Sequence, residues 1–202
     1  MALNLKGIQE AGGDDVYLKT TENGELAIAD LTRVWTAKGY GWQAMATSAV
    51  ASLIVRPDTV AIATLYNNTA KNFIIERVFA HNLVSIANGQ FGIWLCVHPV
   101  GMTAPTNDIT IRNNTSGLVA GTEGIFDAGA TVVDNGWFPW GPNSTSVTAT
   151  VPGSLTEALV RGQIIIPPRA AISASCVGQT ASVTVCMGFH WYSVPTTEFA
   201  TS

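Results

Sequence analysis

The sequence predicts an all-β fold, and three observations lead to that prediction. From residue 59 onward, short runs alternate between apolar and polar or small side chains, as half-buried strands do. Asn, Gly and Pro separate these runs. The strand–helix–strand pattern of a parallel sheet does not occur. Roughly eight strands are expected after Pro57, too many for one sheet with a naked apolar face, so we expect an antiparallel β-sandwich of jelly-roll type.

The clearest strand lies near the C-terminus, at residues 183–191. Its odd positions carry large apolar side chains, namely Val183, Val185, Met187, Phe189 and Trp191. Its even positions carry Thr184, Cys186, Gly188 and His190. Alternation of this kind places the odd face in the core. The even face is less polar than a solvated face, which predicts that a second layer or a neighbouring subunit covers it.

The N-terminal part, residues 1–57, is the least regular, and we expect an extended arm that docks on another surface. Asn23-Gly24 between apolar runs predicts a hairpin within it. The small-residue run 42–51 is either a short helix or an extended segment that docks on a neighbouring copy or a larger particle. The predicted division is an arm at 1–57, a sandwich at 58–195 and a loose tail at 196–202.

Between the arm and the last strand, several segments have the strand, short turn, strand spacing of an antiparallel meander. They are residues 59–66, 73–84 and 90–97. The stretch 98–144 is long and rich in Gly and Asn, and connections of that length are usually functional or interfacial. Residues 154–157 have the form of a capping box, which predicts one or two helical turns.

Composition restricts the partners of the chain. Charged residues make up only 12% of it, whereas ordinary soluble domains carry about 25%. Obligate interfaces are depleted in charge, so we expect a homo-oligomer. The net charge is −4 and the 10 basic residues form no cluster, which gives no support for a nucleic-acid partner. No apolar stretch approaches the roughly 20 residues of a membrane span, and no secretion signal is visible, so we expect synthesis in the cytoplasm and no membrane partner.

Residues with chemical potential are few and scattered. The cysteines are Cys96, Cys176 and Cys186, and the histidines are His81, His98 and His190. We expect buried, reduced thiols, although a bond between Cys176 and Cys186 is conceivable because they flank one turn. The histidines lack the close spacing of metal-ligand pairs. No nucleophile elbow, phosphate-binding loop or dinucleotide motif occurs. We therefore expect no catalytic residues, no metal, no cofactor and no enzyme activity.

One aromatic segment is a candidate interaction loop. Trp137, Phe138 and Trp140 lie close together, and Pro139 and Pro142 stiffen the segment. Such rings either stack on sugars or anchor in the pocket of a partner. The simpler alternative is that they close one end of the sandwich. Carbohydrate binding through residues 137–140 is accordingly the alternative function.

Two stretches near the C-terminus carry a resemblance. The pattern I-x-I-P-P-x-A-A-I-x-A-S at 164–175, followed by V-x-V-x-M-x-F-x-W-Y at 183–192, resembles the end of jelly-roll virion proteins of tailed phages. Residues 30–79 are similar to head-decoration or fibre-base proteins of that kind. The resemblance transfers no functional residues.

The resemblance implies a structural virion protein, made in the host cytoplasm, that self-associates, often as a trimer. Such a protein attaches through an N-terminal arm to the major capsid protein or to another virion protein. It decorates or cements a capsid, or a tail or fibre base, and acts by assembly.

Overall fold

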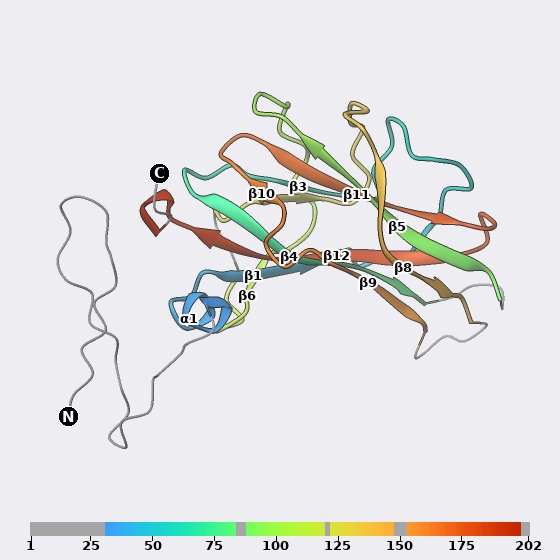
Figure 1. The fold of residues 1–202 in the computed structure, drawn as a ribbon, viewed down its shortest axis with the longest axis horizontal. Coiled ribbons are helices and arrows are strands. Elements are labelled where there is room, and N and C mark those ends of the chain that lie inside the picture. The colour runs from blue at the N-terminus through green and yellow to red at the C-terminus, as the bar shows by residue number, and fades with distance from the viewer. Residues whose placement is uncertain (1–30, 84–87, 120–121, 148–152, 199–202) are drawn as a thin grey trace, which may run out of the picture. The chain divides into compact units, whose positions relative to one another are not determined.

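The computed structural model describes residues 31–83, 88–119, 122–147 and 153–198. Its contacts divide the chain into two units, Met1–Val34 and Trp35–Ser202. Of the first unit only residues 31–34 are described, and they begin the short helix α1 (Leu31–Ala37). The second unit is an antiparallel β-sandwich (Figure 1), which confirms the predicted all-β fold.

Two sheets form the sandwich (Figure 1). The seven-stranded sheet has the order β10 (Ile165–Ile166), β4 (Asn72–Asn82), β12 (Thr184–Val194), β1 (Gly41–Met45), β6 (Arg112–Asn113), with β2 (Val50–Ala51) beside β12 and β9 (Leu155–Leu159) beside β4. The five-stranded sheet has the order β7 (Ile125–Asp127), β3 (Ala63–Tyr66), β11 (Ala171–Gly178), β5 (Gln90–His98), β8 (Phe138–Thr145). A 3-10 turn, Thr196–Glu198, follows β12.

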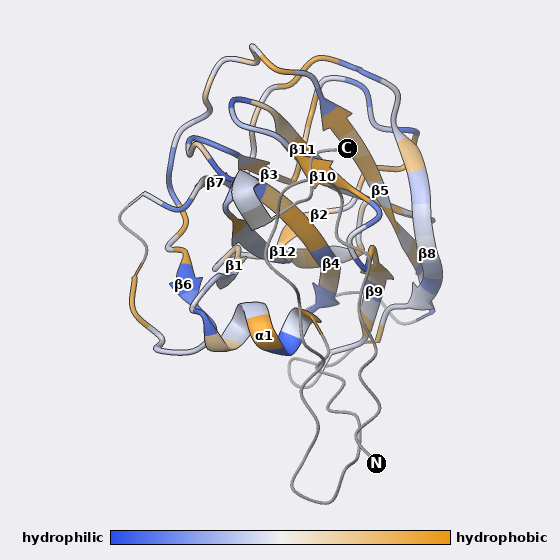
Figure 2. Ribbon diagram, turned by 60° about the vertical axis from the view of Figure 1, so that its left-hand side comes forward, coloured by the Kyte–Doolittle hydropathy of each residue, from blue (hydrophilic) through white to orange (hydrophobic). Residues whose placement is uncertain are grey.

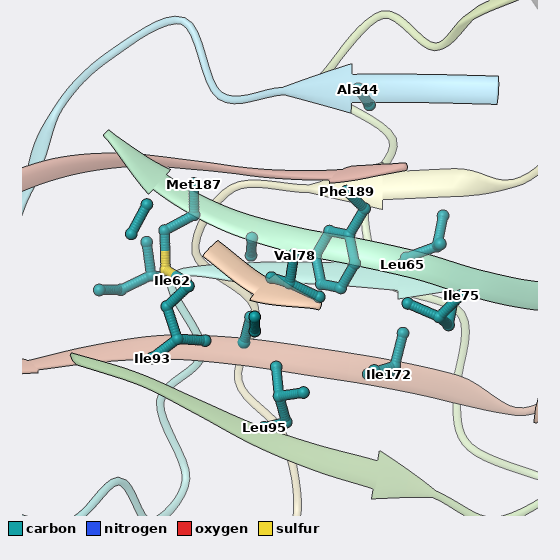
Figure 3. Close-up of a cluster of buried hydrophobic side chains, with 14 of the residues drawn as sticks. Ala44, Ile62, Leu65, Ile75, Val78, Ile93, Leu95, Ile172, Met187 and Phe189 are labelled. Carbon is teal, nitrogen blue, oxygen red and sulfur yellow. The ribbon is translucent and has the colours of Figure 1, made fainter. Parts of the chain in front are cut away.

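The main core lies between the sheets, and the apolar colour runs along β4 and β5 in Figure 2. The odd residues at 183–191 are all fully buried, as the alternation predicts. Figure 3 shows Met187 and Phe189 of β12 in one cluster with Ile93 and Leu95 of β5. Burial of these side chains is the main stabilising contribution, at about 1.5–3 kcal/mol each.

The even face of β12 is partly covered by residues of the same chain. The ring of Phe79 lies over Gly188, where an added Cβ would meet the ring Cζ at 2.4 Å. At the far end of the strand, Trp35 packs on Tyr192 with ring centroids 5.5 Å apart. Cys186 is buried, whereas Thr184 and His190 are half-buried.

The N-terminal boundary differs from the sequence prediction. The run 42–51 is not helical, since it consists of β1, a bend at 47–48 and β2. β1 lies inside the sheet between β12 and β6, with Gln43 opposite His190. Ala44 is buried in the core, so this segment packs within its own chain. Residues 35–57, predicted to belong to the arm, are therefore part of the sandwich unit. The predicted hairpin at Asn23-Gly24 and the rest of residues 1–30 lie outside the described residues.

The predicted helical turn at 154–157 is wrong, because these residues lead into and form strand β9. Thr156 and Ala158 are buried while Leu155 and Leu159 are exposed, which is the two-residue period of a strand. The Thr156 hydroxyl donates to the Pro142 carbonyl oxygen at 2.6 Å. Pairing with β4 outweighs the local capping pattern.

All three cysteines are free and buried, as predicted. Cys176 lies on β11 and Cys186 on β12, in different sheets. Burial raises the pKa of each thiol, that of Cys176 to about 12. Within the described part of the chain, no helix has both the length and the apolar character needed to cross a membrane.

Candidate functional site

Residues 130–137, in the long connection from β5 to β8, build a second layer on the outer face of the five-stranded sheet. Its side chains form a small apolar cluster with outward-facing residues of the sheet, made up of Ala61, Cys96, Ala130, Val132 and Trp137. The Trp137 indole Nε1 donates to the Asp58 carbonyl oxygen at 2.8 Å, which ties the layer to the segment before β3. The outer face of this sheet is therefore covered by its own chain.

The predicted aromatic loop is divided between two places. Trp137 is only 4% exposed and belongs to the outer cluster. Phe138 and Trp140 lie on β8, and their half-buried rings pack against the core between the sheets. Strand alternation explains the division, because residues 137 and 138 point to opposite faces. Trp140 also borders a groove of about 360 Å³ with Asn143 and Glu157.

A buried chain of polar side chains runs beneath the second layer. Thr64 Oγ1 lies 2.9 Å from Ser173 Oγ, which lies 2.8 Å from His98 Nε2, and His98 Nδ1 lies 2.8 Å from Asn135 Oδ1. An amide oxygen only accepts, so His98 Nδ1 carries the proton and Nε2 accepts from the Ser173 hydroxyl. Thr64 therefore donates to Ser173 Oγ.

The hydrogen-bonded series Ser173, His98 and Asn135 has the order of a nucleophile, a base and an orienting amide. Its burial nevertheless argues for a structural role. Ser173 is fully buried, and His98 is 2% exposed. Burial lowers the pKa of His98, which favours the neutral ring that this hydrogen-bond pattern requires. These hydrogen bonds fix Asn135, and with it residues 131–135, to the sheet.

Above His98 and Asn135 lies a cleft of about 470 Å³ between residues 99–103 and 131–135. Val100, Val132 and Val133 give it apolar walls. Next to the cleft, Arg56 donates to both carboxylate oxygens of Asp134, at 2.7 and 3.1 Å. The hydrogen bond from Arg56 lowers the pKa of Asp134 to about 2.

Exposed branched side chains surround this cleft and the Arg56–Asp134 pair. We call them the β-branched patch, and its members are Ile54, Val55, Val60, Val100 and Val133. Each is more than half exposed. The sequence prediction missed the patch, because its members come from three separate segments. The long Gly-rich connection was the only sequence signal that pointed to this region.

The outer face of the seven-stranded sheet carries a second polar group. Arg77 Nε donates to His190 Nδ1 at 3.0 Å, and Arg77 Nη1 donates to Glu157 at 2.9 Å. Burial, with a smaller contribution from the Arg77 charge, lowers the pKa of His190 to about 4. Among the described residues, no group of three or more His, Cys, Asp or Glu side chains is placed to hold a metal ion.

Comparison with known proteins identifies no relative of this chain. No family model, curated protein or solved structure matches it. The functional argument therefore depends on its own fold, surface and residues.

Proposed function

We propose that this chain is a structural virion protein that self-associates and decorates or cements a phage capsid, or a tail or fibre base. The β-branched patch carries the proposal. Large exposed apolar patches mark surfaces that bind a partner. Here five apolar side chains, each more than half exposed, lie on segments that contact one another, in a chain of which only 12% of the residues are charged. An assembly protein needs such surfaces and no catalytic group.

The order of the strands supports the jelly-roll part of the proposal. The longer strands in chain order are β1, β3, β4, β5, β8, β9, β11 and β12. They fall into two sets of four neighbours, β1-β12-β4-β9 and β3-β11-β5-β8. This is the order expected of a double-sheet jelly roll, an architecture that recurs in viral capsid and lectin domains. Because one fold serves many functions, the order supports the virion role by analogy only.

Two measurements test the proposal. Light scattering on the purified chain should give the mass of an oligomer, with a trimer favoured. Co-expression with the genes encoded beside it should place the chain in sedimenting particles. A monomer at every concentration, with the chain left in the supernatant, would rule the proposal out.

Carbohydrate binding stays the alternative, and the groove beside Trp140 is the observation that favours it. The Trp140 ring borders the groove together with the Asn143 amide and the Glu157 carboxylate, and this combination of side chains suits a sugar. Trp137 has no part in this site, since it is buried and its Nε1 is bonded to Asp58. Glycan-array binding that Trp140→Ala abolishes would favour this function, and a blank array would exclude it.

A further inference from the structure

We propose that the β-branched patch is where one copy of this chain binds another, with Ile54 and Val55 of one copy inserted into the cleft of the next. The inference rests on the proposed self-association and names the surface that performs it. Three properties of the patch support it: its continuity, its shape and its charge.

Contacts between distant segments make the patch continuous. Val60 forms a bridge with Thr131, and the Thr59 carbonyl oxygen accepts from the Val132 amide at 2.9 Å. The Arg56–Asp134 ion pair joins the same two segments at a second point. The segments that carry Ile54, Val60 and Val133 are therefore held as one surface over the five-stranded sheet.

The patch has both a projection and a cavity. Ile54 and Val55 are consecutive branched residues, 61% and 66% exposed, in the loop between β2 and β3. Figure 1 shows this loop, in teal, extending beyond the strands. The cleft of about 470 Å³ has Val100 and Val133 in its walls. A projection on one copy that enters a cavity on the next gives a head-to-tail contact between copies.

The charge of the patch argues against a polyanion as its partner. Arg56 pairs with Asp134, and the exposed Asp58 also acts on the Arg56 charge, so two carboxylates balance the one guanidinium. An apolar patch with this charge gives a polyanion such as nucleic acid nothing to bind.

Hydrogen bonds also fix one wall of the cleft to the sheet. His98, which lines it, is held through Ser173 to the sheet, and Asn135 is held through His98. A site fixed in advance loses less conformational entropy on association than a mobile one. The apolar walls of the cleft therefore contribute more of their burial to affinity.

Two variants test the contact directly. Val55→Asp changes the projection and Val133→Asp changes the cleft, and each places a charge where we expect a buried apolar contact. Each should weaken self-association at least about tenfold, measured as the shift in the concentration at which the oligomer dissociates. Leu118→Asp is the matched control, because Leu118 is 69% exposed but lies beside β6 of the other sheet. Urea titration of each variant checks that it is folded.

Cross-linking tests the pairing itself. A V55C variant and a V133C variant, mixed and oxidised, should form a disulfide between copies, because the three native thiols are buried. V55C mixed with a Leu118→Cys variant should not. The mass of the linked product distinguishes a two-fold pair from a closed ring, and both use the proposed contact.

The outcomes separate this inference from the proposed function. If the wild-type chain is an oligomer that V55D and V133D dissociate no more easily than L118D, the inference is overturned and self-association stands. If V55C and V133C do not cross-link while the wild-type chain is oligomeric, the pairing is also overturned. If the wild-type chain is a monomer at all concentrations, self-association fails and this inference fails with it.

Discussion

The two sheets differ in what covers their outer faces. The connection from β5 to β8 covers the five-stranded sheet with an apolar cluster around Trp137. On the seven-stranded sheet, Trp35 covers one end, while Phe79 is half-buried and Leu155 is 50% exposed. Part of the low charge of the chain is therefore explained within the chain, because the described residues form two further apolar clusters beside the main core. Only the remaining exposed apolar surface requires a partner.

His98 and His190, one on each outer face, also have different neighbours. Burial lowers the pKa of both rings, but His98 is held by neutral hydrogen-bond partners, whereas His190 faces the Arg77 guanidinium. The outer face of the five-stranded sheet, the covered face, therefore keeps His98 away from charge. The outer face of the seven-stranded sheet, the open face, pairs His190 with a charged network.

Phe189→Ala should have the largest effect, because it leaves a cavity in the core common to both sheets. Phe189 is fully buried and packs edge-on against Phe126, with ring centroids 5.7 Å apart. We expect a loss of about 3–5 kcal/mol in the free energy of unfolding, measured by urea titration. A loss near zero would contradict the register of β12.

Trp137→Ala should cost about 3 kcal/mol, close to the cost of a core substitution, because the covered face is a second core. The variant also loses the hydrogen bond to Asp58. The same urea titration measures it, with Trp137→Phe keeping most of the apolar volume as the control. A cost below 1 kcal/mol would mean that the second layer contributes little and that the two faces are alike.

Gly188→Ala tests the open face, where a new methyl group would meet Phe79 Cζ at 2.4 Å and the Ala44 carbonyl oxygen at 2.6 Å. We expect a loss of about 1–3 kcal/mol from overpacking. Phe79→Ala in the same chain should recover part of this loss, but not all, since the backbone contact persists. Equal losses with and without Phe79 would show that the ring does not lie over Gly188.

Acid should destabilise the protein through His98, which is buried, and His190, which is half-buried. The unfolded chain protonates His190 near the ordinary pKa of 6.5, whereas the folded chain does so only near 4. Between these pH values the unfolded state binds more protons, so stability falls as the pH is lowered. The fall in the urea midpoint should be shallower in His190→Gln. An unchanged slope would assign the pH dependence to other groups such as His98.

Leu155→Ser should have the smallest effect, within about 0.5 kcal/mol, because Leu155 is exposed on the open face. Urea titration and light scattering on the same sample measure stability and mass. A change in mass would show that the open face, and not the β-branched patch alone, binds another copy.

Local sequence patterns are reliable here where burial has a regular period. The alternation at 183–191 predicted the buried face of β12 correctly, because one strand face between two sheets allows no other arrangement. A different local pattern was misleading at 154–157, where a capping box suggested a helix. There the partner strand β4 decides the conformation, and a partner distant in sequence is invisible to a local pattern.

The candidate site was less predictable than the fold. The aromatic segment was located correctly, but its division between two faces follows from the start of β8 at Phe138. The chain from Thr64 to Asn135 joins four segments, and no spacing in the sequence relates them.

By itself, then, the sequence determined an all-β sandwich, the core face of its last strand and three buried thiols, since each depends on local alternation and side-chain polarity. Only the tertiary structure decided that residues 35–57 belong to the sandwich, that the long connection forms a second layer, and that five branched residues form one patch. These features depend on which distant segments pack together. That choice is made by the free energy of the whole fold and leaves no periodic trace in any one segment.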